Sequence, residues 1–347
     1  MKIAHVVWGM ETGGIETMLV NIINEQTRTQ DVALFVINDF VEESILSKVS
    51  SRCKIVLFKR KPGSKNPFPL LMLNISLHRF NPDIIHVHSA GVSRIIWGQR
   101  NIVRTIHNTR NTTKEYPKMA ALYAISHAVK EDVCKLGFNN VTVVPNGIRV
   151  SEFKKKEKYS KHGSRFHIIQ VGRLFIKQKG QNCLINALEI LVKQRGYKDL
   201  SVHFVGDGPD SEYLHNIVKE KDLEAFVGFE GVKTQEYLQT HLCDYDLFVQ
   251  PSNYEGFGLT VAEAMAAKLP VIVSDIEGPM EIIDNGLYGM SYRCGDVVDL
   301  ADKIESVLTN GYEDSMIDMA YDRVDKKYNV EQTAKKYLEE YEKILNK

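Results

Sequence analysis

The chain has 347 residues, of which 44% are hydrophobic and 25% charged, a composition typical of globular proteins and a length that allows two domains. No run of 18 uncharged apolar residues occurs, which excludes a membrane-spanning helix. The five cysteines are widely separated and lack C-x-x-C spacing, so neither a disulfide framework nor a zinc site is indicated, and a reducing, cytoplasmic location is expected.

Charge is unevenly distributed although the formal net charge is zero. Residues 1–150 carry 19 Lys and Arg against 11 Asp and Glu, and the remainder is acidic by the same margin. A basic run, Lys59-Arg60-Lys61, is followed closely by Lys65. It is either a solvated loop or a contact for a polyphosphate or anionic lipid headgroups, the latter placing the protein peripherally on the inner face of the cytoplasmic membrane. Nucleic acid is disfavoured as a partner because no aromatic residues interleave with these charges.

Short apolar runs alternate with segments of helical periodicity through the first half. The first run is too short for a signal peptide and is interpreted as a buried strand. Strands are expected at residues 3–8, 32–37, 54–58, 84–87, 102–107, 122–125 and 141–144, and helices at 15–24, 69–79 and 127–136. Because these strands are continuously apolar and helices lie between them, they predict a parallel sheet covered on both faces.

The turn sequence Pro145-Asn146-Gly147 interrupts this pattern, and the polar segment 154–164 is interpreted as a domain linker. Alternation then resumes, with strands expected at 166–171, 201–205, 225–229, 245–250, 270–274 and 286–290, and helices at 181–194, 211–219, 234–242 and 257–267. The last helix carries one apolar stripe, made of Val330, Ala334, Leu338, Tyr341 and Leu345. Two parallel-sheet α/β domains in tandem predict a ligand cleft at the carboxyl ends of the strands.

The strongest chemical signal is the segment 251–266, where a strand, a glycine-containing loop and a helix beginning near Phe257 follow one another. Free backbone N–H groups at such a helix start bind anions such as phosphate. Glu263 is the only charge between Glu255 and Lys268, and burying it without a partner would cost several kcal/mol. The hydroxyls of a ribose would satisfy it; alternatively it reaches solvent or pairs with an arginine. Glu255 lies in the loop, where it can reach a second part of the same ligand.

A second signal follows the first strand of the second half, at 171–180. Arg173 and Lys179 can place two cations beside one phosphate group, although basic loop residues are often only solvated. A third, Gly13-Gly14, follows the first strand of the chain and allows close approach of a ligand. Neither this loop nor 206–209 completes a G-x-G-x-x-G fingerprint, which weakens an oxidoreductase interpretation.

His86, His88 and His107 end two expected strands of the first half. One such histidine is more often structural, but three facing one cleft favour a functional site. No carboxylate or further histidine at suitable spacing indicates a mononuclear metal site. Asp244-Tyr245-Asp246 has the form of a metal-binding D-x-D, but it precedes its strand and is therefore interpreted as structural.

Together these segments resemble family 4 glycosyltransferases of the GT-B fold, close to bacterial exopolysaccharide and capsular polysaccharide enzymes. The resemblance covers nearly the whole chain and is carried by residues 13–16, 83–89, 105–107, 124–126, 144–148, 172–180 and 205–209 and by the Glu255-x7-Glu263 motif. It implies an acceptor-binding Rossmann-like domain at 1–150, a donor-binding one at 151–328 facing it across a cleft, and a final helix, 329–347, packed back on the first domain. Ala267-Lys268-Leu269-Pro270 departs from the family pattern, because many relatives have Gly where a left-handed helix cap is needed.

The resemblance also implies the roles of the site residues. Arg173 and Lys179 would hold the donor diphosphate, Glu263 the ribose and Glu255 the donor sugar, with His107 near the anomeric centre. The phosphate cradle would be completed by Gly13, Gly14 and the backbone of Phe257, Gly258, Leu259 and Thr260. Glu16 and His86 are candidates for the acceptor site.

The expected activity is transfer of a sugar from a nucleotide sugar, UDP-linked rather than GDP-linked, to a lipid-linked saccharide in surface polysaccharide synthesis. Family members retain the anomeric configuration and need no metal or other cofactor. No sure nucleophile is evident, which favours a front-face mechanism. The alternatives are a nucleotide-sugar 2-epimerase of the same fold and a non-catalytic nucleotide-sugar-binding partner of another transferase.

Overall fold

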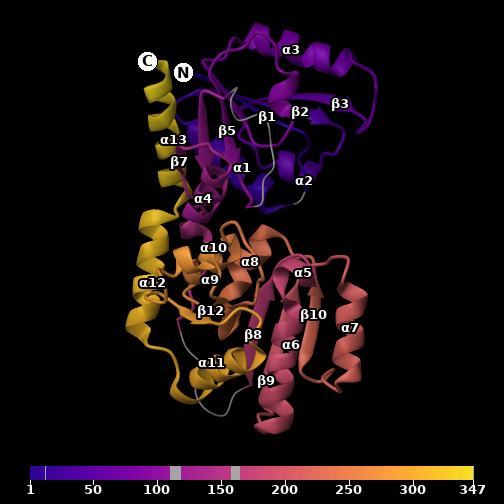
Figure 1. Cartoon of the computed structure of the whole chain (residues 1–347), viewed down its shortest axis with the longest axis vertical. Coiled ribbons are helices and arrows are strands. Elements are labelled where there is room, and N and C mark those ends of the chain that lie inside the picture. The colour runs from indigo at the N-terminus through magenta and orange to yellow at the C-terminus, as the bar shows by residue number, and fades with distance from the viewer. Residues whose placement is uncertain (12, 110–118, 158–164, 347) are drawn as a thin grey trace. The chain divides into compact units, whose positions relative to one another are not determined.

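The computed structural model describes residues 1–11, 13–109, 119–157 and 165–346. The chain divides into two compact units (Figure 1). Unit 1 consists of Met1–Ile148 and Tyr328–Lys347, and unit 2 of Arg149–Lys327. Unit 2 is thus inserted, in sequence, between the body of unit 1 and its last helix.

Unit 1 contains a seven-stranded parallel sheet in the order β3-β2-β1-β4-β5-β6-β7. Its strands are β1 (Lys2–Val7), β2 (Asp31–Asn38), β3 (Lys54–Arg60), β4 (Ile84–Val87), β5 (Ile102–Ile106), β6 (Ala121–Ala124) and β7 (Val141–Val143). All residues of β4 and β5, and all but the first of β1 and β2, are buried. The parallel sheet predicted from the continuous apolar runs is confirmed.

Helices cover both faces of this sheet. They are α1 (Gly14–Gln26), α2 (Glu43–Leu46), α3 (Phe68–Phe80), α4 (His127–Lys135) and α13 (Val330–Leu345), with the 3₁₀ turn η1 (Val92–Ile95). Successive side chains of β2 point to opposite faces, so Phe35 packs with Leu73 of α3 whereas Leu34 packs with Leu19 of α1. The sheet therefore has two apolar layers, each covered by its own helices.

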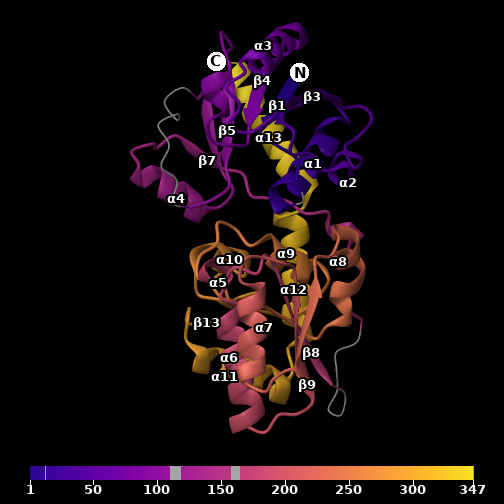
Figure 2. The same cartoon turned by 90° about the vertical axis from the view of Figure 1, so that its right-hand side faces the viewer.

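The last helix, α13, belongs to unit 1 and packs against α1 (Figure 2). Val330 and Tyr341 of the expected stripe are buried there with Ile3, whereas Leu345 remains 39% exposed. The stripe omitted Tyr337, which is fully enclosed in the same cluster.

Polar bonds also join α13 to unit 1. The Tyr341 hydroxyl lies 2.5 Å from Nδ1 of His86, and the Tyr337 hydroxyl lies 2.8 Å from Oγ1 of Thr105. Just before the helix, the backbone of Ile148 exchanges hydrogen bonds with Tyr328 and Val330. The two segments at which unit 1 is interrupted therefore lie side by side.

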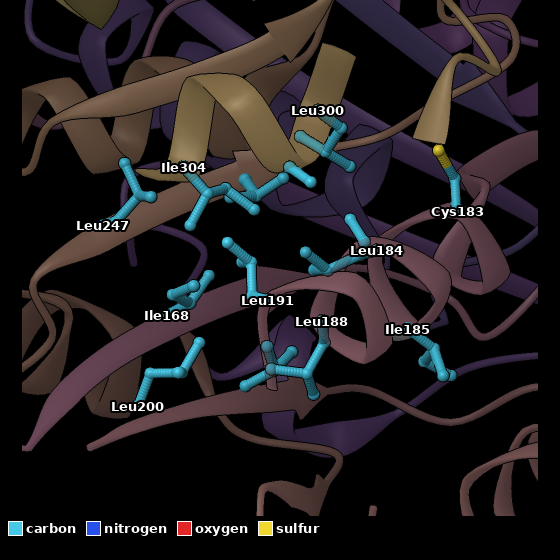
Figure 3. Packing of buried hydrophobic residues seen from close by; sticks show 14 of the residues in the cluster. Ile168, Cys183, Leu184, Ile185, Leu188, Leu191, Leu200, Leu247, Leu300 and Ile304 are labelled. Carbon is cyan, nitrogen blue, oxygen red and sulfur yellow. The ribbon is translucent and has the colours of Figure 1, made fainter. Parts of the chain in front are cut away.

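Unit 2 contains a six-stranded parallel sheet in the order β10-β9-β8-β11-β12-β13. Its strands are β8 (Phe166–Val171), β9 (Leu200–Val205), β10 (Val227–Gly231), β11 (Leu247–Gln250), β12 (Val271–Ser274) and β13 (Met290–Tyr292). Its helices are α5 (Ile176–Lys179), α6 (Gln181–Glu189), α7 (Ser211–Glu220), α8 (Gln235–His241), α9 (Leu259–Ala266), α10 (Glu277–Ile282), α11 (Val297–Asn310) and α12 (Asp314–Lys327), with a π-helical turn η4 (Ile190–Gln194) and 3₁₀ turns η3 (Val150–Glu152) and η5 (Leu242–Asp244). Figure 3 shows one layer of its core, where Leu188 of α6, Ile168 of β8 and Ile304 of α11 meet.

Four local features bear on the expectations from the sequence. The described part of the expected linker belongs to unit 2, because Lys156 is buried and pairs with Asp246 at 3.1 Å; residues 158–164 lie outside the described part of the chain. Asp246 also accepts a hydrogen bond from the backbone N–H of His167, so this carboxylate is structural, as expected.

The strand expected at 286–290 begins only at Met290, after a turn at Gly286. Lys268 has a φ of 56°, so a lysine occupies the left-handed cap where many relatives have glycine.

Candidate active site

Two loops of unit 2 meet where the order of its sheet reverses. The chain runs from β8 outward to β9 and β10 on one side, and from β11 to β12 and β13 on the other. Because β8 and β11 are parallel neighbours, the loops that follow them start at the same edge of the sheet. Such a switch point is where ligands bind in open α/β sheets.

Lys179, at the end of the first loop, forms an ion pair with Glu255 of the second. Both side chains are about 85% buried, with exposed fractions of 16% and 15%. An ion pair at this depth is screened less by solvent than a surface pair. The structure thus joins two residues that the sequence placed in separate motifs.

The backbone of the two loops is locked together around this pair. Gly180 has a φ of 62°, and a Cβ there would collide with the carbonyl oxygen of Pro251. The N–H of Asn253 donates to the carbonyl oxygen of Gln178 at 2.8 Å. Only glycine at position 180 permits this approach, because any other residue would both clash and adopt an unfavourable backbone conformation.

Helix α9 begins immediately after the second loop, two residues later than expected. Gly258 occupies its N-cap position with a φ of 104° and offers no side chain to cap it. Phe257 is buried, whereas Leu259 and Thr260 form the first turn of the helix. The backbone N–H groups of Leu259 and Thr260 are of the kind that a helix start presents to an anion.

Glu263 lies one turn further along α9 and is only 7% exposed. Its Oε1 accepts a hydrogen bond of 2.8 Å from Nε2 of Gln235, at the start of α8. Burial raises the pKa of Glu263 to about 7, and the bond from Gln235 opposes that rise. The carboxylate therefore has little access to solvent, and among the residues that the structure describes an amide rather than an arginine holds it.

Arg173 is exposed, in the loop after β8. Its backbone carbonyl is fixed by a hydrogen bond of 2.9 Å from Nε2 of Gln181. The guanidinium is thus carried by an anchored backbone, in the loop that also leads to Lys179.

In unit 1, the loop after β1 leads into α1. Gly13 is the N-cap residue of α1 in an extended conformation and, being glycine, has no side chain with which to cap the helix. Glu16 follows in the first turn, and its pKa is raised mainly by burial and also by the charges of Glu11 and Glu42.

The expected histidines form a buried group in unit 1. His86 and His88 have ring centroids 4.0 Å apart, and the rings of His88 and His107 are 5.7 Å apart. His5, which the sequence analysis did not single out, lies opposite His86 in the sheet, and its Nδ1 is 3.0 Å from Nε2 of His88.

Burial is the main cause of unusual ionisation in this group. It lowers the pKa of His5 and His107 to about 4 and the pKa of His86 and His88 well below the ordinary value of 6.5. Four neutral imidazoles are therefore expected at neutral pH.

Nitrogens of His5, His86 and His88 lie within 4.8 Å of one another, close enough to hold a metal ion. However, both nitrogens of His86 already have partners, in Tyr341 and Thr105, and His5 bonds to Gln26 and His88. A metal would have to displace these bonds. Within the described residues both nitrogens of His107 lack a hydrogen-bond partner, which leaves this histidine available to a ligand.

Two family models match the chain, one after the other. The model described as glycosyltransferase family 4 matches residues 12–152, and the one described as glycosyl transferases group 1 matches residues 151–323. The chain is a glycosyltransferase of these families. The second match contains Arg173, Lys179, Glu255 and Glu263, and the first contains the helix start at Gly13 and the histidines 86, 88 and 107.

Several curated relatives are named as glycosyltransferases. A poly(ribitol-phosphate) alpha-N-acetylglucosaminyltransferase of Staphylococcus aureus is 30% identical over 208 residues, which are 59% of this chain and 41% of that protein. The amylovoran biosynthesis glycosyltransferase AmsK of Erwinia amylovora is 30% identical over 56% of this chain and 50% of its own. The match thus spans half or less of both relatives.

Solved structures of low sequence identity share the fold over the whole glycosyltransferase chain. Anabaena Alr3699/HepE, crystallised with UDP and glucose, superimposes with a TM-score of 0.82 at 18% identity, covering 99% of this chain and 100% of that one. TarM superimposes with a TM-score of 0.81 at 16% identity, covering 100% and 99%. The GT-B fold expected from the sequence is confirmed. None of the helices in the described part of the chain is long and apolar enough to cross a bilayer.

Proposed function

We propose that this glycosyltransferase moves a sugar from a nucleoside-diphosphate sugar to a saccharide acceptor in surface polysaccharide synthesis. The observation that carries the proposal is the Lys179–Glu255 pair at the switch point of unit 2, beside the uncapped start of α9. The ammonium group of Lys179 and the first backbone amides of α9 can bind a diphosphate, and the carboxylate of Glu255 can accept hydrogen bonds from sugar hydroxyls.

The chemistry follows from charge. Cleavage of the bond between the sugar and the diphosphate builds negative charge on the leaving oxygen. Lys179, Arg173 and the first amides of α9 stabilise that charge more in the transition state than in the ground state. On donor binding, Lys179 exchanges its bond to Glu255 for one to phosphate, which frees the carboxylate for the sugar.

We further propose that the donor nucleotide is UDP-linked and that the reaction retains the anomeric configuration. The first point rests on the Anabaena neighbour, whose crystals contain UDP and glucose. His107, neutral and without partner among the described residues, can hydrogen-bond a sugar hydroxyl without charging. No clear nucleophile is evident among the described residues, and a front-face reaction, in which the departing phosphate and the attacking hydroxyl occupy the same face of the sugar, is therefore part of the proposal.

No metal is required in this scheme, because Lys179 and Arg173 supply the positive charge that a divalent cation supplies elsewhere. Activity that survives extensive chelation supports this point, and activity restored only by a divalent cation contradicts it.

For the acceptor we propose a lipid-linked saccharide, with unit 1 resting on an anionic bilayer. Residues 44–109 contain eleven Lys and Arg and a single acidic residue, Asp83. Lys59, Lys61 and Lys65 are exposed, whereas Arg60 bonds to the carbonyl oxygen of Ser64.

Exposed apolar side chains accompany these charges. Phe68 and Leu71 of α3 are 61% and 44% exposed, and Trp97 is 54% exposed. Asn74 of α3 bonds to the backbone of Ile95 and Trp97, which holds the tryptophan beside the helix. Basic residues next to exposed aromatic ones favour the interface of an anionic bilayer.

Vesicle sedimentation tests the membrane contact. The wild type should bind phosphatidylglycerol vesicles but not phosphatidylcholine vesicles. Binding to phosphatidylglycerol should be weaker in the double variants Lys59→Glu/Lys61→Glu and Phe68→Ser/Trp97→Ser. Equal binding of these variants and the wild type contradicts the contact.

A thermal-shift screen with UDP, GDP and ADP tests the nucleotide, since a ligand at a hundredfold its Kd stabilises by about 2.7 kcal/mol. Incubation with the donor sugar nucleotide alone and with an acceptor tests the reaction. Product only with acceptor supports transfer. An epimerised donor without acceptor identifies an epimerase, and binding without any turnover identifies a non-catalytic subunit.

A further inference from the structure

The carboxylate of Glu263 is held by one neighbouring side chain. In the described part of the chain, Gln235 is the one side chain seen to donate a hydrogen bond to it, at 2.8 Å. The two residues come from different helices, α8 and α9, and are 28 positions apart. The rest of α9 is uncharged, so the helix itself offers Glu263 no counter-charge.

We propose that Gln235 is a positioning residue for nucleoside recognition: it fixes Oε1 of Glu263 so that the other carboxylate oxygen faces the ribose hydroxyls of the donor. The proposal rests on the nucleotide-sugar activity proposed above. It adds a residue in α8 to a site otherwise built from α5, α9 and the two loops.

The chemistry of the amide suits this role. A carboxylate accepts hydrogen bonds, so the amide must present its NH₂ group to Glu263, as it does here. A lysine or arginine in its place would form an ion pair and compete with the ribose. A neutral donor partly compensates the buried charge and leaves lone pairs for two hydroxyls.

The position of Gln235 is itself fixed. It is the first residue of α8, whose N-cap Thr234 accepts a hydrogen bond of 3.2 Å from the backbone of Tyr237. A side chain at a capped helix start varies less in position than one on an irregular loop.

Several charged groups on or beside the elements packed against α9 form ion pairs with one another rather than with Glu263, and α10 adds two carboxylates, Glu277 and Glu281. Lys268, just after α9, pairs with Asp318 of α12. Arg149, just before η3, pairs with Glu152. Further along α12, Arg323 pairs with Asp284 and Lys326 with Asp322. Burial and Gln235 are the two causes acting on the pKa of Glu263.

The test measures whether Gln235 and the ribose hydroxyls are coupled. Dissociation constants for UDP and 2′-deoxy-UDP are determined for the wild type, for Gln235→Leu and for the nearly isosteric Gln235→Met. The wild type should prefer UDP by about tenfold, as expected for a hydrogen bond to a charged group. In both variants UDP should bind more weakly and the preference should fall to about twofold or less.

Gln239→Leu is the matched control. Gln239 lies on the same helix, and its Nε2 donates to Glu152 rather than to Glu263. This variant should keep both the UDP affinity and the preference over 2′-deoxy-UDP. A loss of preference equal to that of Gln235→Leu would show a general effect of α8 and overturn the proposal.

A pH profile provides a second readout. UDP affinity should fall as pH drops through about 7, where Glu263 takes up a proton. Without Gln235 the ionised carboxylate is less stabilised, so the midpoint should move to higher pH.

The outcomes separate the two proposals. If wild-type protein does not bind UDP, GDP or ADP, the nucleotide-sugar function fails. If UDP binds but both position-235 variants, shown to be folded by circular dichroism, keep the preference and the pH midpoint, the function stands and the role of Gln235 is refuted. Should Gln235→Leu fail to fold, Gln235→Met gives the same decision.

Discussion

Lys179 and Glu255 form an ion pair across 76 positions of sequence, tying the loop after β8 to the loop after β11. Each holds the other in place while no donor is bound. The ion pair thus keeps both side chains at the switch point, where a diphosphate sugar can replace it with bonds of its own to the lysine and the carboxylate. The first prediction follows from this exchange.

Lys179→Ala should lower turnover by about 10²–10³-fold, the loss typical of removing one donor that stabilises developing charge. Initial rates with donor and acceptor provide the measurement. Lys177→Ala, an exposed lysine of the same short helix, is the control and should retain near-normal turnover. Comparable rates for wild type and Lys179→Ala would remove this lysine from the mechanism.

Glu263→Gln should stabilise the protein at high pH while weakening UDP binding. The pKa of Glu263 in the folded chain, about 7, lies above its ordinary value of 4.5. The folded state therefore binds more protons between these values, and stability falls as pH rises from 4.5 to 7, by on the order of 3 kcal/mol. Urea unfolding at pH 5 and pH 8 should show the variant gaining relative to wild type at the higher pH. A pH-independent difference would contradict the raised pKa.

Acid should destabilise unit 1 through its histidines. Their folded pKa values lie below 6.5, so the unfolded chain binds more protons and stability is lost as pH falls below 6.5. For His107, with a folded pKa of about 4, the loss at pH 5 is about 2 kcal/mol. His107→Gln should therefore lose less stability between pH 7.5 and 5 than wild type. The exposed His78→Gln serves as control and should follow the wild-type curve.

Tyr341→Phe should destabilise unit 1 by about 1–3 kcal/mol, because it leaves Nδ1 of the buried His86 without a partner. Tyr123 offers a matched control in the same cluster: it is fully buried, and within the described residues its hydroxyl has no partner. Tyr123→Phe should be neutral or stabilising. The denaturant midpoints of Tyr341→Phe, Tyr123→Phe and the wild type provide the measurement. Equal midpoints for the two variants would argue against the bond to His86.

Much of the fold was predictable because it depends on local signals. Continuous apolar runs such as that of β2 mark strands buried on both faces, and the intervening helices force them to run parallel. The sequence placed Lys179 and Glu255 in separate loops after strands, and the two meet because loops that follow neighbouring parallel strands share one edge of a sheet. Helix α9 started later than expected because Gly258, rather than Phe257, takes the cap position.

Contacts between distant segments were not predictable in this way. Gln235 reaches Glu263 only because the fold brings the start of α8 within hydrogen-bond distance of α9, and nothing in the spacing of the two residues indicates it. His5 could have been noticed as a polar residue inside an apolar strand, but its neighbour His88 is 83 positions away. Lys156 looked like part of a solvated linker because its partner, Asp246, is equally remote.

The discontinuity of unit 1 bears on how the chain is made. A ribosome makes α13 only after all of unit 2, so unit 2 can begin to fold while unit 1 still lacks this helix. Until then the surface that α13 later covers, including Ile3 and Met18, is exposed to solvent. His86 and Thr105 likewise lack the hydrogen bonds that Tyr341 and Tyr337 later form with them. A nascent chain stalled before Val330 should therefore be prone to aggregation and a preferred client of chaperones that bind exposed apolar surface.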